Sequence, residues 1–191
     1  MKAETNRGKT QKNRINATVI IPNYNGIRYL RDCLRSLLDC EEAVFPVIVV
    51  DNGSGDGSRE MLRNEFSQVR LICFAENRGF SAAVNAGIRA ANTPYVILLN
   101  NDTIVEKHFV SRLCGALDAD GRYFSAGARM VTMADPDIID DAGDFYCVLG
   151  WDFARGKVKR RERYQRPCDI FAACGGAAAY RKGILEELGL F

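Results

Sequence analysis

Four apolar runs in this sequence end in short groups of amide, carboxylate and glycine residues. The groups are PNYNG at 22–26, DNGSGDG at 51–57, AENRG at 75–79 and NND at 100–102. Asn, Asp and Gly are common turn residues, and turn formation alone accounts for any one group. Because each group follows an apolar run, the repeated pattern favours one polar ligand site assembled from several loops.

Asp102 is the carboxylate of the last group, and it follows two amides, Asn100 and Asn101. Hard cations such as Mg²⁺ and Mn²⁺ prefer oxygen ligands, and proteins often hold them with one or two carboxylates and substrate phosphates. We therefore predict a divalent cation, Mg²⁺ or Mn²⁺, that bridges Asp102 and a diphosphate.

Several common active-site patterns are absent from the sequence. The glycines at 53, 55 and 57 fit neither a P-loop nor the dinucleotide-binding fingerprint. There is no G-x-S-x-G sequence, and the single histidine, His108, falls in a predicted helix, which disfavours a Ser/His hydrolase. The seven cysteines contain no C-x-x-C pair, which disfavours a Cys/His zinc site.

Periodicity predicts the elements that position these groups. Nearly continuous apolar runs, typical of strands buried on both faces, predict strands at 17–22, 46–51, 69–74 and 95–100. Apolar residues on one face predict helices at 27–39, 80–91 and 107–118. A strand near 124–131 and a loop-rich stretch to about 168 follow. This alternation predicts an α/β fold with a mainly parallel sheet whose carboxyl edge holds the ligand.

Length and composition are typical of one soluble domain. The chain has 191 residues, of which 47% are hydrophobic and 26% are charged. Its longest apolar runs are far shorter than the ~20 residues of a membrane-spanning helix, and the sequence shows no signal-peptide core. Because an odd number of scattered cysteines fits a reducing compartment, we expect a cytoplasmic protein.

The net charge of +2 conceals two basic segments. Residues 1–16 hold five basic residues against Glu4, and residues 155–166 hold seven against Glu162. The first segment has almost no apolar residues and is predicted to be a disordered tail, with residues 17–191 as the folded domain. The second is a candidate contact for a phosphate-bearing lipid or for the anionic inner face of a membrane. Local patches of this kind favour such a partner over nucleic acid.

Phe145, Tyr146 and Trp151 precede the second basic segment. Aromatic residues between elements most often pack in a core. The alternative is a platform on which an acceptor stacks, and the sequence leaves both interpretations open.

The sequence resembles a known family in five ordered motifs. They are TVIIPNYNG, VIVVDNGSGDGS, ENRGFSAAVNAGI, YVILLNNDT and CGGAAAYRKGILEELGLF. Together they resemble the inverting family 2 glycosyltransferases of GT-A fold, from about residue 17 to the end. The NNDT and DNGS segments look most like the bacterial rhamnosyltransferase-like group that builds cell-surface polysaccharides. The resemblance implies transfer from a UDP- or dTDP-sugar to a saccharide or lipid-linked acceptor.

The family's nucleotide-binding residues match positions on the first two strand exits. Pro22, Asn23 and Tyr24 would line the nucleotide pocket. Asp51 and Asn52 would hydrogen-bond the base and the ribose. These roles are implied by the resemblance alone.

Two further segments match the family. Asn77, Arg78 and Gly79 begin a turn that would close over the nucleotide, with Arg78 as a contact for phosphate or base. Small residues would line the sugar and acceptor side of the cleft, and these are Gly175, Gly176 and Ala177. Small side chains there would let a substrate approach the backbone.

Asn100-Asn101-Asp102 occupies the place of the family's Asp-x-Asp motif, in which the last acid binds the metal. Asn100 departs from the Asp at the first position. An amide still hydrogen-bonds a ribose but adds no negative charge. Metal affinity would therefore depend on Asp102 and the diphosphate.

The resemblance implies one displacement at the anomeric carbon, with inversion. A cation would stabilise the departing diphosphate, and a carboxylate would accept the proton of the acceptor hydroxyl. The family's base lies in a Glu-Asp motif shortly beyond the GLF segment, and this sequence ends at Phe191. No catalytic base is therefore assigned, and we expect the chain, as a truncated domain, to bind a nucleotide sugar but to transfer poorly.

Two other functions stay open at this point. A non-catalytic nucleotide-sugar-binding module would share the motifs and lack the base. A sugar nucleotidyltransferase would have a related α/β architecture, but a Gly-rich loop bearing Lys or Arg is typical directly after its first strand. This sequence reads PNYNGIRYL there, which disfavours that function.

Overall fold

Parallel strands form most of the main sheet in the computed structural model, which describes residues 13–41 and 43–191. The parallel strands are β1 (Ala17–Asn23), β2 (Val47–Asp51), β3 (Arg70–Cys73) and β4 (Tyr95–Leu99). Their β-branched and aliphatic side chains are almost all buried, as strands covered on both faces require. The four strands predicted from apolar runs are confirmed to within two residues at each end.

Two further strands complete the sheet in the order β3-β2-β1-β4-β10-β5. The strand β10 (Ala177–Arg181) pairs antiparallel with β4, and β5 (Ser125–Gly127) pairs antiparallel with β10. The sequence analysis did not predict β10, because the run AAAYR is rich in alanine, a strong helix former. Here two neighbouring strands impose the extended conformation. The mainly parallel α/β sheet is confirmed.

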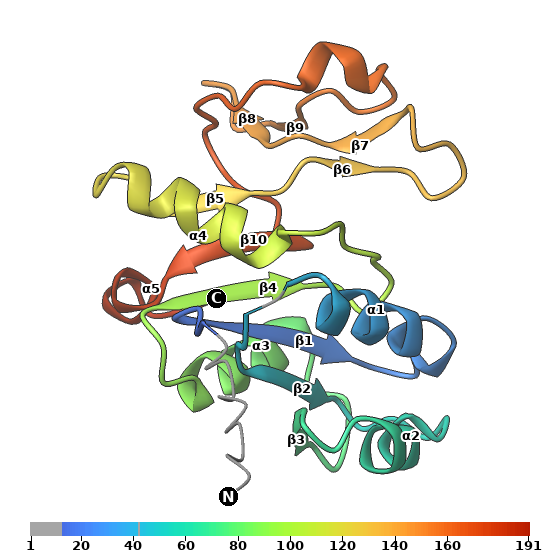
Figure 1. The fold of residues 1–191 in the computed structure, drawn as a ribbon. Coiled ribbons are helices and arrows are strands. Elements are labelled where there is room, and N and C mark those ends of the chain that lie inside the picture. The colour runs from blue at the N-terminus through green and yellow to red at the C-terminus, as the bar shows by residue number, and fades with distance from the viewer. Residues whose placement is uncertain (1–12, 42) are drawn as a thin grey trace, which may run out of the picture.

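Helices cover both faces of this sheet (Figure 1). One face packs on α1 (Ile27–Asp39), α2 (Ser58–Glu65) and α4 (Phe109–Ala119). The other face packs on α3 (Phe80–Ala90) and α5 (Lys182–Leu188). Side chains alternate along each strand, so Val19 and Ile21 of β1 join the first layer and Ile20 joins the second.

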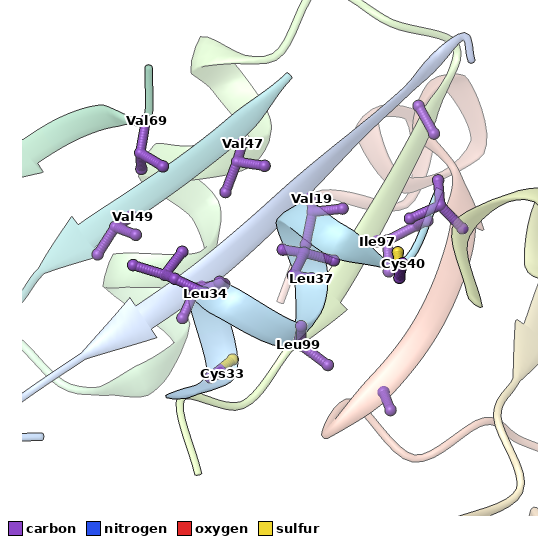
Figure 2. Packing of buried hydrophobic residues seen from close by; sticks show 14 of the residues in the cluster. Val19, Cys33, Leu34, Leu37, Cys40, Val47, Val49, Val69, Ile97 and Leu99 are labelled. Carbon is purple, nitrogen blue, oxygen red and sulfur yellow. The ribbon is translucent and has the colours of Figure 1, made fainter. Parts of the chain in front are cut away.

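The helix α1 supplies much of the first layer. Leu34 and Leu37 point from α1 toward Val19, Val49 and Leu99 of the sheet (Figure 2). All five of these side chains are fully buried. Their spacing on one helical stripe is the pattern that predicted this helix, whose bounds match the prediction.

Gly87 lets α3 lie directly on β1. A Cβ atom at this position would be 2.4 Å from Cγ2 of Ile20, which is fully buried. Overpacking of this kind costs about 1–3 kcal/mol. Although alanine favours helices, we expect Gly87→Ala to lower the free energy of unfolding. The measurement is urea titration followed by far-ultraviolet circular dichroism.

Gly115→Ala in α4 is the matched control, because a Cβ atom there has no neighbour within 4 Å. We expect this change to raise the free energy of unfolding by up to about 1 kcal/mol, since alanine has the higher helix propensity. Equal effects of the two substitutions would contradict the close approach of α3 to β1.

Several expectations need correction. Helix α4 begins at Phe109, so His108 precedes the helix, in a left-handed conformation with φ of 65°. The strand expected near 124–131 is divided between β5 and β6 (Met130–Val131), which belong to different sheets. The helix α2 was not predicted, because its eight polar-rich residues carry little apolar periodicity.

The stretch expected to be loop-rich contains short elements of its own. A two-stranded sheet joins β6 to β7 (Ile139–Asp141), and a hairpin joins β8 (Asp144–Tyr146) to β9 (Asp152–Ala154). The 3₁₀ helix η1 (Arg161–Tyr164) follows. These elements lie beyond the β5 edge of the main sheet, at the top of Figure 1. Their strands of two or three residues were too short to show periodicity.

Backbone hydrogen bonds connect the segment before β1 to the loop that precedes β2. The backbone of Val44 donates to Asn13, and the Ile15 N–H donates to Val44, each over about 3 Å. Residues 1–12, most of the predicted basic tail, lie outside the described residues. Within the described part of the chain, no helix is long and apolar enough to cross a membrane.

Candidate nucleotide-sugar site

Asn23, the last residue of β1, connects three of the strand exits. Its Nδ2 atom donates to Oδ2 of Asp51 over 3.1 Å and to Oγ of Ser54 over 3.3 Å. Its Oδ1 atom accepts a 2.8 Å hydrogen bond from Nδ2 of Asn101. The exits of β1, β2 and β4 are therefore joined by side chains, as the sequence analysis expected of one carboxyl edge.

Asp51 ends β2 and has no exposed surface. Its carboxylate accepts hydrogen bonds from Asn23, from the Ser54 N–H and from Nε of Arg59. Burial by itself raises the pKa of Asp51, but these hydrogen bonds outweigh it and hold the pKa below the usual value. Asp51 is thus an ionised anchor for the loop 52–57.

Asn52 holds the turn that follows β3. Its Nδ2 atom donates to Oδ1 of Asn77 over 2.9 Å and to the Gly79 carbonyl over 3.0 Å. Its Oδ1 atom accepts from the N–H of Arg78 over 2.8 Å. The exposed turn 77–79 is therefore fixed against the exit of β2, and the guanidinium of Arg78 lies 5.0 Å from the centre of the Phe74 ring.

Gly53 is required where these two loops meet. Its φ is +84°, and a Cβ atom there would lie 2.6 Å from the carbonyl carbon of Glu76. Such a distance is far inside van der Waals contact, and L-residues rarely adopt this φ. The backbone conformation and the close approach of Glu76 therefore require glycine at position 53, whether or not a ligand binds.

The exit of β4 brings the predicted metal residues and the predicted acceptor residues together. The Asn100 N–H donates to the Gly176 carbonyl over 2.8 Å, so the segment from Gly175 to Ala177 lies beside NND. A Cβ atom on Gly176 would be 3.2 Å from Nδ2 of Asn100. These small residues and the amide therefore share one wall of the site.

Asp102 is exposed beside that wall. It makes no hydrogen bond or ion pair within residues 13–41 and 43–191. In the same residues, no three His, Cys, Asp or Glu side chains are grouped so that they could hold a metal ion. A hard cation at this edge fits the arrangement predicted from the sequence, with one carboxylate and phosphate oxygens of a substrate as ligands.

Tyr24 and Pro22 lie on either side of Asn23. The Tyr24 side chain is half exposed, and Pro22 is partly buried. The following loop is held by Ser54, whose Oγ accepts from the N–H of Asn25 over 2.9 Å. The Tyr24 ring is thus an exposed apolar surface next to buried polar groups.

Two residues of the site were missed by the sequence analysis. Arg59 of α2 pairs with Asp51 and also donates to the Phe74 carbonyl over 2.7 Å. Asp56 accepts from the Ile27 N–H over 2.8 Å and from the Ser58 N–H over 3.0 Å, so one carboxylate caps the starts of α1 and α2. The signal available in the sequence was an acid two residues before Ser58, which is typical of a helix start.

A second group of acids lies outside this edge, at β7, β8 and β9. Asp141 is buried and accepts a 2.7 Å hydrogen bond from the Gly143 N–H. Burial, together with the negative charges of Asp141 and Asp152, raises the pKa of Asp144 to about 6. None of these acids hydrogen-bonds to the residues of the predicted site.

The raised pKa of Asp144 predicts a pH-dependent stability. In the unfolded chain an aspartate has a pKa of about 3.9, so the folded state binds this proton more tightly. The unfolding free energy should then fall as the pH rises from about 4 to about 6. We expect Asp144→Asn to raise stability at neutral pH and to flatten this slope, as measured by urea unfolding across that range.

Asp118→Asn on α4 is a control, because Asp118 lies outside the acid group of β7 to β9. This substitution should not change the fall of the unfolding free energy with pH that is assigned to Asp144. An unchanged slope in Asp144→Asn itself would contradict the assignment.

A family model for glycosyl transferase family 2 matches residues 18–189. The chain belongs to glycosyl transferase family 2. The family predicted from the five motifs is therefore confirmed. The glycosyltransferase GlyG of Streptococcus pneumoniae serotype 4 is 31% identical over 159 residues, which cover 78% of this chain and 49% of GlyG. The teichoic acid poly(glycerol phosphate) polymerase of Staphylococcus epidermidis is 32% identical over 89 residues, covering 44% of this chain and 12% of that protein.

The fold of this family 2 chain also resembles solved glycosyltransferases. The mannosyltransferase PcManGT of Pyrobaculum calidifontis, solved with GDP-Man and Mn²⁺, superposes with a TM-score of 0.65 at 19% identity. The match covers 93% of this chain and 48% of that one. The GT-A fold is thereby confirmed, and the chain spans about half the length of GlyG and of PcManGT.

Proposed function

We propose that the chain binds a nucleotide-diphosphate sugar at the carboxyl edge of β1 to β4 and serves in glycosyl transfer. The observation that carries this proposal is the hydrogen-bonded set of Asn23, Asn52 and Asn101, with Asp102 exposed beside it. Four loops are held in one arrangement before any ligand arrives. Such preorganisation reduces the entropic cost of binding a flexible ligand.

The nucleotide lies against the exits of β1, β2 and β3 in this proposal. The exposed Tyr24 ring offers a stacking surface, and Pro22 and Asn23 form the floor beneath it. Arg78 supplies a positive charge for phosphate or base. Asn52 and Asp51 are both buried and hydrogen-bonded within the fold, so they contact the ribose or the base only if one of their present partners moves.

The diphosphate and the sugar lie against the exit of β4. Asp102 holds the divalent cation, Mg²⁺ or Mn²⁺, while Asn100 and Asn101 donate to oxygens of the ribose or the diphosphate. A cation held there would supply positive charge to stabilise the departing nucleoside diphosphate. The Mn²⁺ in the PcManGT complex supports a divalent cation as the cofactor.

The sugar is transferred by inversion in one displacement. The bond between the anomeric carbon and the diphosphate oxygen breaks while the acceptor hydroxyl oxygen attacks from the opposite side. A base takes the hydroxyl proton, and no residue of this chain is assigned that role. Gly175, Gly176 and Ala177 leave room for the sugar and the acceptor beside Asn100.

The donor is a UDP- or dTDP-sugar, and the acceptor is a saccharide or a lipid-linked saccharide of the cell surface. The teichoic acid polymerase among the relatives supports a role in cell-surface polysaccharide synthesis. The rhamnosyltransferase-like group remains the proposed subgroup. The basic segment 155–166 supports a peripheral position at the anionic inner face of the membrane.

Isothermal titration calorimetry with UDP, dTDP and GDP, each with and without Mn²⁺, tests the proposal. We expect binding of UDP or dTDP that strengthens when Mn²⁺ is present. Transfer is assayed in parallel by release of the nucleoside diphosphate from a nucleotide sugar. No binding of any nucleotide would sink the proposed site, and pyrophosphate release from a nucleoside triphosphate and a sugar phosphate would favour a nucleotidyltransferase.

A further inference from the structure

The β8–β9 hairpin ends in an exposed apolar tip. The Cys147 N–H donates to the Trp151 carbonyl and the Gly150 N–H donates to the Cys147 carbonyl, each over 2.9 Å, so the tip is a closed turn. Val148 is 102% exposed and Leu149 is 81% exposed. These two aliphatic side chains are therefore held in water by an ordered backbone.

One face of the hairpin continues this apolar surface. Phe145 and Phe153 are directly opposite each other across the strands, and Trp151 lies on the same side by strand alternation. All three rings are about half exposed or more. The core interpretation of the aromatic residues is therefore wrong, and a large apolar patch of this kind marks an interaction site.

The same face leads to a basic cavity. The ladder continues past β9, because the Arg155 N–H donates to the Gly143 carbonyl over 2.7 Å, so Arg155 shares the face of Phe153. The guanidinium of Arg155 lies 4.8 Å from the centre of the Tyr164 ring. Arg155, Arg163 and Arg166 line a cavity of about 400 Å³, and Glu162 is the acid that lines it.

Part of the basic segment is neutralised by neighbouring acids and part is not. Lys157 pairs with Asp140 over 3.6 Å, and Arg161 pairs with Asp137 over 3.1 Å. In the described part of the chain, Lys159, Arg163 and Arg166 form no ion pair. Those cations remain available for an anionic partner, and two of them line the cavity.

We infer that the β8–β9 hairpin inserts its tip into an anionic lipid surface while the arginine-lined cavity holds a lipid headgroup phosphate. Four residues of extended strand, about 13 Å, separate Trp151 from Arg155. That spacing matches a tip buried about 5–10 Å in the boundary between headgroups and acyl chains, with the cations at the phosphates. Exposed Trp beside cations is typical of the membrane interface.

The side chains at the tip favour a lipid surface over a saccharide as the partner of the hairpin. A saccharide platform requires flat aromatic faces, whereas Val148 and Leu149 are aliphatic and are the most exposed large apolar side chains of the described residues. A lipid surface accounts for the aliphatic tip, the aromatic face and the cavity together. This inference deepens the peripheral membrane contact proposed above and does not depend on donor binding at the other edge.

The intrinsic fluorescence of the protein reports insertion directly, because Trp151 is the only tryptophan. The full chain is mixed with vesicles of phosphatidylcholine, with or without phosphatidylglycerol. We expect sedimentation with the anionic vesicles, a blue shift of Trp151 emission, and quenching by lipids brominated on the acyl chains. Raising salt from about 50 mM to about 500 mM should weaken the binding.

The double variant Val148→Ser and Leu149→Ser tests the tip and keeps the reporter. We expect its partition onto anionic vesicles to fall by about tenfold or more, since two apolar side chains no longer transfer from water. Met133→Ser is the matched control, because Met133 is also exposed but lies in the β6–β7 loop. It should bind as the wild type does.

Arg163→Gln with Arg166→Gln tests the cavity, and it should reduce binding to anionic vesicles while leaving any weak binding to neutral ones. Vesicle binding without a blue shift or quenching of Trp151 would overturn insertion, as would no binding at all. UDP binding is measured on each variant. If the wild type does not bind UDP, the proposed donor site is wrong, and the vesicle result is unaffected.

Discussion

Asp102→Ala is expected to lower the affinity for UDP or dTDP in the presence of Mn²⁺ by about 100-fold, which corresponds to about 3 kcal/mol. Asp102 is exposed, and it is the one carboxylate among the three residues at the β4 exit. Because Asn100 and Asn101 carry no charge, no neighbouring ligand replaces it. The difference is measured by calorimetric titration of wild type and variant with and without Mn²⁺.

The stability of the variant should be unchanged, because Asp102 makes no hydrogen bond or ion pair within the described residues. Glu106→Ala, four residues farther along the same loop, is the matched control and should bind the nucleotide as the wild type does. Equal Mn²⁺ dependence in wild type and Asp102→Ala would refute the metal site.

Asp51→Ala is expected to destabilise the fold by about 3–5 kcal/mol, the usual cost of breaking a buried ion pair. The side chain is fully buried, and its removal leaves Asn23, the Ser54 N–H and Arg59 without their common acceptor. The measurement is urea unfolding followed by far-ultraviolet circular dichroism. Glu60→Ala, an exposed acid next to Arg59 on α2, should change stability little.

Lowering the pH should also reduce the unfolding free energy through the carboxylate of Asp51. The pKa of Asp51 is lower in the folded protein than its ordinary value, so its contribution is present above about pH 4 and is lost as the pH falls further. Asp51→Asn should therefore lose this part of the acid dependence. If either Asp51 variant is as stable as the wild type at neutral pH, the anchoring role of Asp51 is contradicted.

The sequence alone was sufficient to predict the central strands and the edge at which their polar exits meet. Runs of β-branched residues are a local property, and so is the helical stripe of α1, so both could be predicted without knowledge of the fold. The polar residues at the exits of β1, β2 and β4 met at one edge because parallel strands end on the same side. Asp102 was predicted as the metal ligand on the same grounds, and the motifs were sufficient to predict the family.

Tertiary structure decided which distant residues meet. The pairing of Arg59 with Asp51 depends on how α2 packs, and the capping of α1 by Asp56 depends on the approach of two loops. The strand β10 forms from an alanine-rich run only because β4 and β5 offer hydrogen bonds on both sides. Propensity describes one segment at a time, and these contacts are gained only when segments pack together.

Exposure of the β8–β9 hairpin was also decided by the fold. An aromatic sequence has the same composition whether it packs in a core or projects into solvent, so the sequence left both open. Phe145, Trp151 and Phe153 are exposed because no other element of the described chain covers that face of the hairpin. The physical reason is general: sequence periodicity determines which residues share a face, and the surrounding elements determine whether that face is buried.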